Sequence, residues 1–308
     1  MTGLRGFDAL EPSFADLDTD EVCEFVADQG AAKTGKDRFV LYSVHDGDRI
    51  PALLRRHFDP IEFVRERDFG ADALAAVIQA VLSLRNRMRF RLARCLLDGG
   101  RFHGLDTPGA AHTSRASIPA RIGSTLTPVE RLWLDRAHAG VDTAIDRLRS
   151  EAAPGALSIG VHTFDPLGAD GTPRPELSLL DLPESVARGR EAIRGYSNPE
   201  LRCERFASTA DPMRMDRLRD LLETAGFQVT RNDPYRLPDG AVELRTHHRA
   251  ERSGEPIRPS AFVLEVRKDL LFTGEMRHAG FAPCEVIAGA IERIGSAVAG
   301  SLNAVWGQ

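Results

Sequence analysis

Two apolar runs that each end in a histidine constrain the fold of this chain most strongly. The run RFVLYSVHDG covers residues 38–47 and contains His45, and the run LSIGVHTFDP covers residues 157–166 and contains His162. Each has the pattern of a buried strand, and the C-terminal end of such a strand faces the crevice in which α/β sheets hold their ligands. The alternative is that each histidine only caps its strand through hydrogen bonds. The matched pair favours a shared site.

A metal centre is the kind of site that two strand-end histidines suit. A catalytic zinc takes about three protein ligands, often two histidines and a carboxylate, and keeps one position open. The carboxylate has two sources near the first histidine. Asp48 follows His45 in an H-x-x-D pattern, and Glu66 or Asp68 lies in the sequence RERDFGAD just before a helix. Acidic residues also stabilise helix starts, so capping is the alternative role for Asp68.

The spacing of apolar residues predicts strands that alternate with helices. Helices are expected at residues 12–30, 68–87, 127–151, 213–225 and 284–302. Strands are expected at residues 38–44, 91–98, 157–162, 175–182, 227–230 and 260–266. Alternation of this kind predicts an α/β fold, a single domain with a mostly parallel or mixed sheet flanked by helices. We assign this domain to residues 37–308, preceded by an N-terminal helical extension at 1–36. Residues 107–125 suit a surface loop or a lid.

Composition excludes several classes of protein. At 308 residues and 42% hydrophobic the chain can bury a large core, and its net charge of −5 is too mild to indicate a nucleic-acid surface. No apolar run approaches the roughly 20 residues that span a bilayer. The first residues lack the basic and apolar regions of a secretory signal. The four cysteines form no C-x-x-C pair, so we expect reduced thiols in a cytoplasmic protein.

A charged pair interrupts the apolar strand AFVLEVRKDL. Glu265 and Arg267 are two residues apart, so their side chains share a face of the strand. Such a pair suits a polar cleft, where the glutamate acts as a general base and the arginine holds a substrate carboxylate. The alternative is a surface salt bridge on an edge strand. A further cluster of charges follows the run that starts at residue 91. It consists of Arg94, Asp98 and Arg101.

Five sequence blocks, taken in order, resemble those of the N-formylglutamate amidohydrolase family. They are SVHDGDRIP around His45, RCLLDGGR at 94–101, VHTFDP around His162, NDPY at 232–235 and EVRKDL at 265–270. The corresponding family blocks read PHxG…IP, SR…DLNR, HSFTP, N-x-P-Y and E-I-R-x-D-L. The resemblance extends over residues 37–275. The chain departs from it at Val44, where the family has proline, and at Gly100, where the family has asparagine.

The resemblance implies a zinc-carboxypeptidase-like fold that hydrolyses the amide bond of an N-formyl or N-acyl amino acid. It implies that zinc is bound by His45, Asp68 and His162. Asp68 is favoured over Asp48 because the family carries an acidic residue before a helix. Glu66 stays an alternative for this ligand. Glu265 would be the general base, and Arg267 would bind substrate beside it. The substrate-binding residues would be Arg94, Asp98, Arg101, Asn232 and Tyr235.

Two other functions remain open at this point. A non-catalytic member of the same fold could bind a small carboxylate ligand, which the altered block around Gly100 favours and the retained histidines oppose. A peptidase is the third hypothesis, since the fold suits peptide ends. For the amidohydrolase, the expected partner is a small-molecule acylated amino acid, and neither a nucleic acid nor a membrane.

Overall fold

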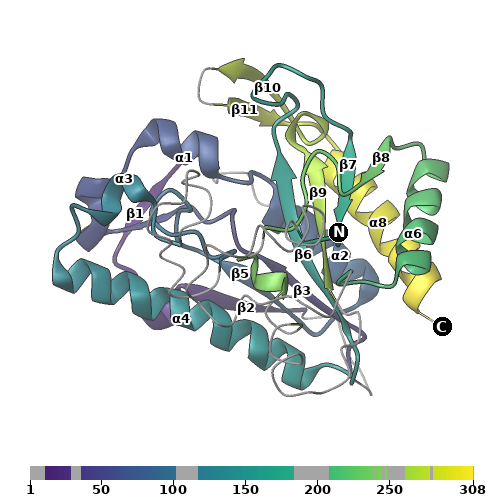
Figure 1. The fold of residues 1–308 in the computed structure, drawn as a ribbon, viewed down its shortest axis with the longest axis horizontal. Helices are drawn as coiled ribbons and strands as arrows, with labels where there is room; N and C mark the ends of the chain where they lie inside the picture. The colour runs from purple at the N-terminus through teal and green to yellow at the C-terminus, as the bar shows by residue number, and fades with distance from the viewer. Residues whose placement is uncertain are drawn as a thin grey trace, which may run out of the picture.

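The computed structural model describes residues 11–28, 36–101, 117–183, 208–238, 240–244, 247, 261–277 and 280–307. Within these ranges a seven-stranded mixed sheet forms the centre, in the order β2-β5-β3-β6-β9-β7-β8 (Figure 1). The strands are β2 (Cys23–Ala27), β3 (Phe39–Ser43), β5 (Asn86–Phe90), β6 (Leu157–Phe164), β7 (Leu177–Leu180), β8 (Val229–Arg231) and β9 (Ala261–Arg267). The strands β5, β3, β6 and β9 are parallel, whereas β2 and β7 join them antiparallel.

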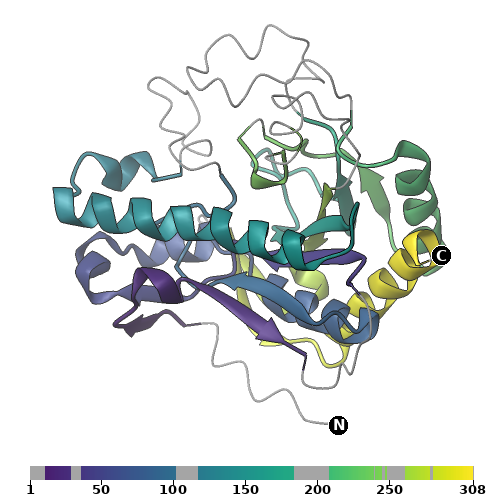
Figure 2. The same cartoon turned by 90° about the horizontal axis from the view of Figure 1, so that it is seen from below.

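Helices cover both faces of this sheet. The long helix α4 (Pro128–Glu151) packs on β2, β5 and β3, and α2 (Ala71–Leu82) packs on the other side of the sheet (Figure 2). Helix α8 (Ala290–Trp306) packs against α2, and α6 (Pro212–Thr224) packs against α8. Because both faces are covered, every residue of β6 is buried. The predicted α/β domain with a mixed sheet flanked by helices is confirmed.

The two helices that flank the sheet begin and end for local reasons. The hydroxyl of Thr127 accepts a hydrogen bond from the backbone N–H of Glu130, and the carboxylate of Glu130 accepts one from the backbone N–H of Thr127. With proline at the first helical position, this capping box starts α4 where the sequence predicts it. Helix α2 follows Gly70 and stops at Ser83, both of which have left-handed backbone angles. The predicted helix 68–87 is therefore shorter at both ends.

The predicted helix at 12–30 is wrong. Its described residues form β1 (Ser13–Ala15), a short 3-10 turn at Thr19–Glu21 and the edge strand β2. Strand β2 pairs with β5 along its whole length, and β1 pairs with β4 (Arg49–Pro51). The apolar spacing here suits either element, and the free edge of β5 decides for a strand. The N-terminal segment thus contributes a strand to the central sheet.

Three further predictions were placed wrongly along the chain. The apolar residues of 91–98 are buried, but they follow β5 in turns and a single β-bridge rather than in a strand, since burial alone does not distinguish the two. A separate hairpin, β10 (Phe272–Arg277) and β11 (Gly280–Val286), follows the strand that was expected to be the last (Figure 1). The final helix starts at residue 290, after the left-handed Gly289, and not at 284.

Five shorter helical elements complete the described structure. They are η3 (Ala52–His57), α1 (Pro60–Glu66), α3 (Ala120–Gly123), η7 (Val242–Leu244) and η8 (Lys268–Leu270). Of the predicted loop at 107–125, residues 107–116 lie outside the described ranges, and α3 occupies part of the remainder.

Candidate active site

The two strand-end histidines meet at the C-terminal edge of the parallel strands. His45 lies two residues beyond the end of β3. His162 lies two residues before the end of the neighbouring strand β6. Both side chains are buried, and their ring centroids are 4.6 Å apart. Because parallel strands end at the same edge of a sheet, residues that are far apart in sequence come into contact here.

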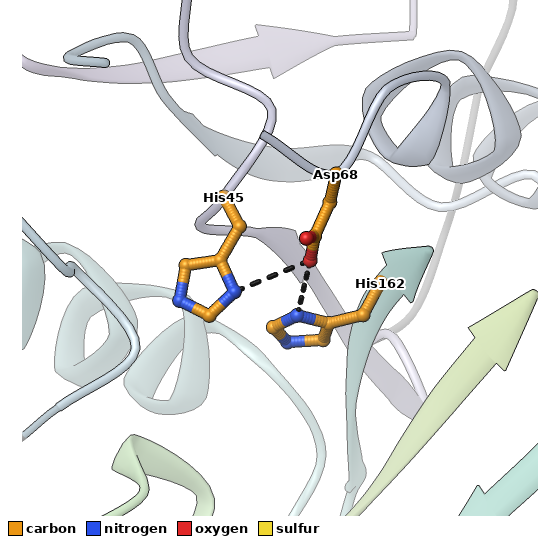
Figure 3. A group of neighbouring side chains, drawn as sticks. All are labelled: His45, Asp68 and His162. Atoms are coloured by element: carbon orange, nitrogen blue, oxygen red, sulfur yellow. Dashed lines mark hydrogen bonds and ion pairs between the residues drawn. The ribbon is translucent and has the colours of Figure 1, made fainter. Parts of the chain in front are cut away.

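Asp68 lies between the two histidines (Figure 3). Its Oδ2 is 3.2 Å from Nδ1 of His45 and 2.8 Å from Nδ1 of His162. One donor atom from each residue lies within 4.8 Å of the others, and all three residues are buried. His45, Arg94 and His162 hold the pKa of the Asp68 carboxyl well below its usual range, although burial alone would raise it. Two imidazole nitrogens and an ionised carboxylate oxygen are a donor set that fits zinc.

Asp48 and Glu66 lie elsewhere. Asp48 is partly exposed and pairs with Arg49, and Glu66 pairs with Arg65 at the end of α1. The loop that carries Asp68 is held instead by Asp46, which accepts hydrogen bonds from Nε of Arg67 at 2.8 Å and from the backbone N–H groups of residues 70 and 72 at 3.1 Å each. This clamp on either side of Asp68 explains why that carboxylate, and not its neighbours, reaches the histidines.

The second nitrogen of His45 is held by a carboxylate. Nε2 of His45 lies 2.7 Å from Oδ1 of Asp98, which also accepts the backbone N–H of Gly100 at 2.9 Å. With its proton on Nε2, the ring turns the lone pair of Nδ1 toward Asp68 and His162. Asp98 was expected to bind substrate, but it does not line the cavity, and its contacts orient His45.

The glycine at position 100 packs against the same ring. A Cβ atom on Gly100 would lie 2.5 Å from Nε2 of His45 and 3.2 Å from Oδ1 of Asp98. A side chain at this position would require the ring of His45 to shift. The departure from the asparagine of the family block is therefore part of how this chain packs His45.

Glu265 lies beside His162 because β6 and β9 are paired in register at these two residues. It lines the cavity, and its Oε2 is shielded from solvent without a hydrogen-bond partner. Burial raises the pKa of Glu265 to about 7; His162 and Arg94 act against this shift, and Asp68 acts with it. A carboxylate with a pKa near neutrality is suited to accept and release a proton.

Two of the predicted arginines have partners within the protein. Arg94 donates to Oδ1 of Asp68 at 3.2 Å and to Oδ2 of Asp98 at 3.3 Å, so it neutralises the carboxylates around the histidines. Arg267 does not line the cavity. It donates to Asp269 and to the backbone carbonyl of Arg174, each at 2.7 Å. Glu265 and Arg267 are two residues apart on β9, but the contacts of Arg267 leave it outside the cavity lining.

Of the two residues of the NDPY block that were expected to bind substrate, one holds a loop and the other lines the cavity. Oδ1 of Asn232 accepts the backbone N–H groups of Asp181 and Leu182 at 2.9 Å each, and the residue has a left-handed φ of 56°. Asn232 thus ties the loop after β8 to the end of β7, and it lies outside the cavity lining. Tyr235 does line the cavity, and its ring centroid lies 4.8 Å from the guanidinium carbon of Arg174.

A cavity of about 700 Å³ opens over these residues. It is lined by the three-residue His45–Asp68–His162 group, by Arg94, Arg101 and Glu265, and by residues that the sequence did not single out, notably Arg174, Glu243 and Lys268. Lys268 is buried and pairs with Asp165 at 2.8 Å. The arginine at 174 sits in a polar turn region and the glutamate at 243 in a short 3-10 turn, where no periodicity marks a site.

Arg174 has an unusual environment for an arginine in this cavity. Its guanidinium lies over the rings of Phe164 and Tyr235, and it donates to the carbonyl of Asp165 at 3.3 Å. Its Nε is buried without a hydrogen-bond partner, and none of the ion pairs among the described residues includes it. Among the described residues, no carboxylate lies within ion-pair distance of this guanidinium, although its charge acts to lower the pKa of Glu265.

The fold is a mixed α/β domain with helices on both faces of its sheet, and the site is a buried group of two histidines and one carboxylate at the sheet edge. A sequence profile of the N-formylglutamate amidohydrolase family matches residues 37–272. The chain belongs to this family of amidohydrolases. No curated protein matches it. In the described part of the chain, we find no helix with the length and apolar character to cross a membrane.

Two solved structures share the fold. The N-formylglutamate amidohydrolase from Ralstonia eutropha JMP134 has a TM-score of 0.58 and 17% sequence identity, and the match covers 92% of this chain and 98% of that one. The gene product Atu2144 from Agrobacterium tumefaciens has a TM-score of 0.55 and 19% identity, covering 93% of both chains. At these identities the similarity establishes the architecture.

Proposed function

We propose that the protein is a metal-dependent amidohydrolase that cleaves the amide bond of an N-formyl or N-acyl amino acid. One observation supports this most directly: His162 of the buried His45–Asp68–His162 group is paired in register with a half-buried glutamate, Glu265, whose Oε2 has no hydrogen-bond partner. Family membership supports the reaction class. The cavity volume is of the size that takes a small molecule.

Nδ1 of His45, Nδ1 of His162 and a carboxylate oxygen of Asp68 are the atoms that would hold zinc. A zinc ion in this position supplies a Lewis acid that polarises a carbonyl and lowers the pKa of water toward about 7. Asp98 would hold the proton of His45 on Nε2, and His45, His162 and Arg94 together favour the ionised form of Asp68. The chain thus prepares both the histidine and the carboxylate as donors.

Glu265 would move the proton of the reaction. Its Oε2 accepts a proton from the water that attacks the substrate carbonyl carbon. The same carboxyl then gives that proton to the amide nitrogen as the C–N bond breaks, which releases the acid and the free amino group. A carboxyl group with a pKa near neutrality can act in both directions.

Arg174 is our candidate for the residue that reads the substrate carboxylate. The sequence favours Arg267 or Arg94 for this role, but Arg267 lies outside the cavity lining and Arg94 is bound to Asp68 and Asp98. The guanidinium of Arg174 lies within the cavity lining without a carboxylate partner among the described residues. A planar guanidinium can bind a carboxylate through two parallel hydrogen bonds.

Replacing Arg174 by lysine is expected to lower kcat/KM for a free-acid substrate by about 10- to 100-fold, mostly through KM, because hydrogen bonds to a charged group are lost and lysine lacks the planar fork. The methyl ester of the same N-formyl amino acid should be hydrolysed equally by both enzymes. Equal losses on acid and ester would contradict the assignment. The Arg267→Lys variant is the comparison. If its kcat/KM falls on the free acid but not on the ester, Arg267 is the residue that binds the substrate carboxylate.

Replacing Gly100 by asparagine, the residue of the family block, is expected to weaken zinc binding by at least about tenfold. The new side chain would displace His45 or break its bond to Asp98, and loss of such a supporting bond typically costs 10- to 100-fold in metal affinity. Competition with a chromophoric chelator measures the change. The control is Gly140→Asn on α4, where the nearest atom to an added Cβ is 3.9 Å away. Unchanged affinity in Gly100→Asn would contradict the packing argument.

The activity is tested on a panel of N-formyl and N-acetyl amino acids with zinc-loaded protein. Release of the free amino acid, measured by its primary amine, is the expected result. Zinc content below about a tenth of an equivalent after exposure to the metal, together with retained binding of the same amino acids, would favour a non-catalytic member of the fold instead.

A further inference from the structure

Asp98 is the buried carboxylate beside Nε2 of His45, and Glu243 is a buried carboxylate on the corresponding side of His162. Glu243, in η7, has only 2% of its surface exposed, and its Oε1 is buried without a hydrogen-bond partner. The nearest polar atom of the candidate metal group is Nε2 of His162, at 4.0 Å. That nitrogen is likewise buried and without a partner. Two buried polar atoms therefore face each other beyond hydrogen-bond distance, and neither has a hydrogen-bond partner in this structure.

Metal binding would change which nitrogen of His162 carries the proton. In the present structure Nδ1 of His162 is 2.8 Å from Asp68, which is a hydrogen bond. A metal on Nδ1 takes the lone pair of that nitrogen, so the proton of the neutral ring must lie on Nε2. Nε2–H then points at Glu243, and a small rotation of either side chain would bring the two atoms to about 2.9 Å.

The path between the two side chains is kept clear by a glycine. Gly160 is two residues before His162 on β6, so both face the same side of the sheet. A Cβ atom at this position would lie 2.6 Å from Oε1 of Glu243 and 3.4 Å from Nε2 of His162. Any larger residue at 160 would occupy the space in which the carboxylate approaches the ring.

The carboxylate of Glu243 has a neighbouring hydroxyl that can steady it. Tyr42 is opposite Gly160 on β3, and its buried hydroxyl has no hydrogen-bond partner in this structure. Burial raises the pKa of Tyr42, and the charge of Glu243 raises it further. Tyr42 therefore keeps its proton and is available as a donor.

The arrangement matches the one around His45. There, Asp98 holds Nε2 at 2.7 Å. The two carboxylate segments are joined, since the backbone N–H of Val242 donates to the carbonyl of Gly100 at 2.9 Å. We infer that Glu243 is the positioning residue of His162, accepting Nε2–H and aiming Nδ1 at the metal. This inference depends on the proposed metal centre.

The test is the zinc Kd of Glu243→Gln, measured on the full-length protein by competition with a chromophoric chelator. We expect the Kd to rise by about 10- to 100-fold. We expect the metal-free variant to unfold at the same temperature as the wild type or a higher one, because a buried carboxylate without a partner is replaced by a neutral amide. A purely structural role would give the reverse, with lower stability and unchanged Kd.

A second variant reaches the same contact without changing the glutamate. Gly160→Ala adds a Cβ that forces Glu243 away from His162, and the same rise in zinc Kd is expected. The control is Glu130→Gln, a buried carboxylate at the start of α4, which should lower stability and leave zinc Kd unchanged. If the wild type binds zinc and both site variants bind it equally well, the role of Glu243 is refuted. If the wild type binds no zinc, the proposed metal centre fails, and this inference with it.

Discussion

Replacing His162 by alanine is expected to abolish zinc binding while the fold is kept. In the proposed metal centre His162 would supply one of three donor atoms, and its loss would leave two, which is fewer than a catalytic zinc needs. A ligand that binds only the folded state adds about 2.7 kcal/mol to the free energy of unfolding at 100 times its Kd. Thermal unfolding with and without zinc should therefore show a stabilisation in the wild type that is absent in the variant, and hydrolysis should fall to background.

The controls for this experiment come from the same chain. His57→Ala removes a buried histidine that pairs with Glu130 outside the site, and it should leave the zinc-dependent stabilisation intact. Asp68→Ala should lose the metal and Asp48→Ala should keep it. Full zinc occupancy in the His162 variant would refute the assignment of His162 as a ligand. Loss of zinc from Asp48→Ala with zinc kept by Asp68→Ala would show that Asp48, in the H-x-x-D pattern, is the third ligand.

Replacing Glu265 by glutamine is expected to lower kcat by about 10²- to 10⁴-fold with zinc still bound, because glutamine keeps the shape of the side chain but cannot take a proton. The measurement is steady-state kinetics on an N-formyl amino acid, together with zinc content after dialysis. Glu176→Gln is the matched control: Glu176 is a half-buried glutamate that accepts the backbone N–H of Gln228 outside the cavity lining.

Two outcomes would overturn the role of Glu265. Turnover close to that of the wild type would show that the proton is taken elsewhere. Loss of zinc from the glutamine variant would make Glu265 a metal ligand, and the metal group would have to be redrawn around four residues.

The elements that could be predicted are those whose signals are local. The Thr-Pro-x-Glu start of α4 is a capping box in the structure, and the apolar run of β6 is a fully buried strand. Where the local signal was ambiguous, the prediction was wrong: residues 23–27 form a strand that pairs with the edge of β5, and residues 91–98 form buried turns. Apolar spacing reports that a side chain is buried, and it does not report which partner buries it.

For the candidate site, the sequence by itself determined which side chains stand at strand ends: His45, His162 and Glu265 follow from the period of their strands and from their place in the family blocks. Only the tertiary structure decided which charges share the cavity. The clamp at Asp46 brings Asp68 to the histidines, and Arg174 lies in the cavity where Arg267 does not. Strand pairing and loop anchoring join residues that are far apart along the chain, so no local pattern records them. The same reason hides the contact between Glu243 and His162, which exists only because β6 and η7 pack together.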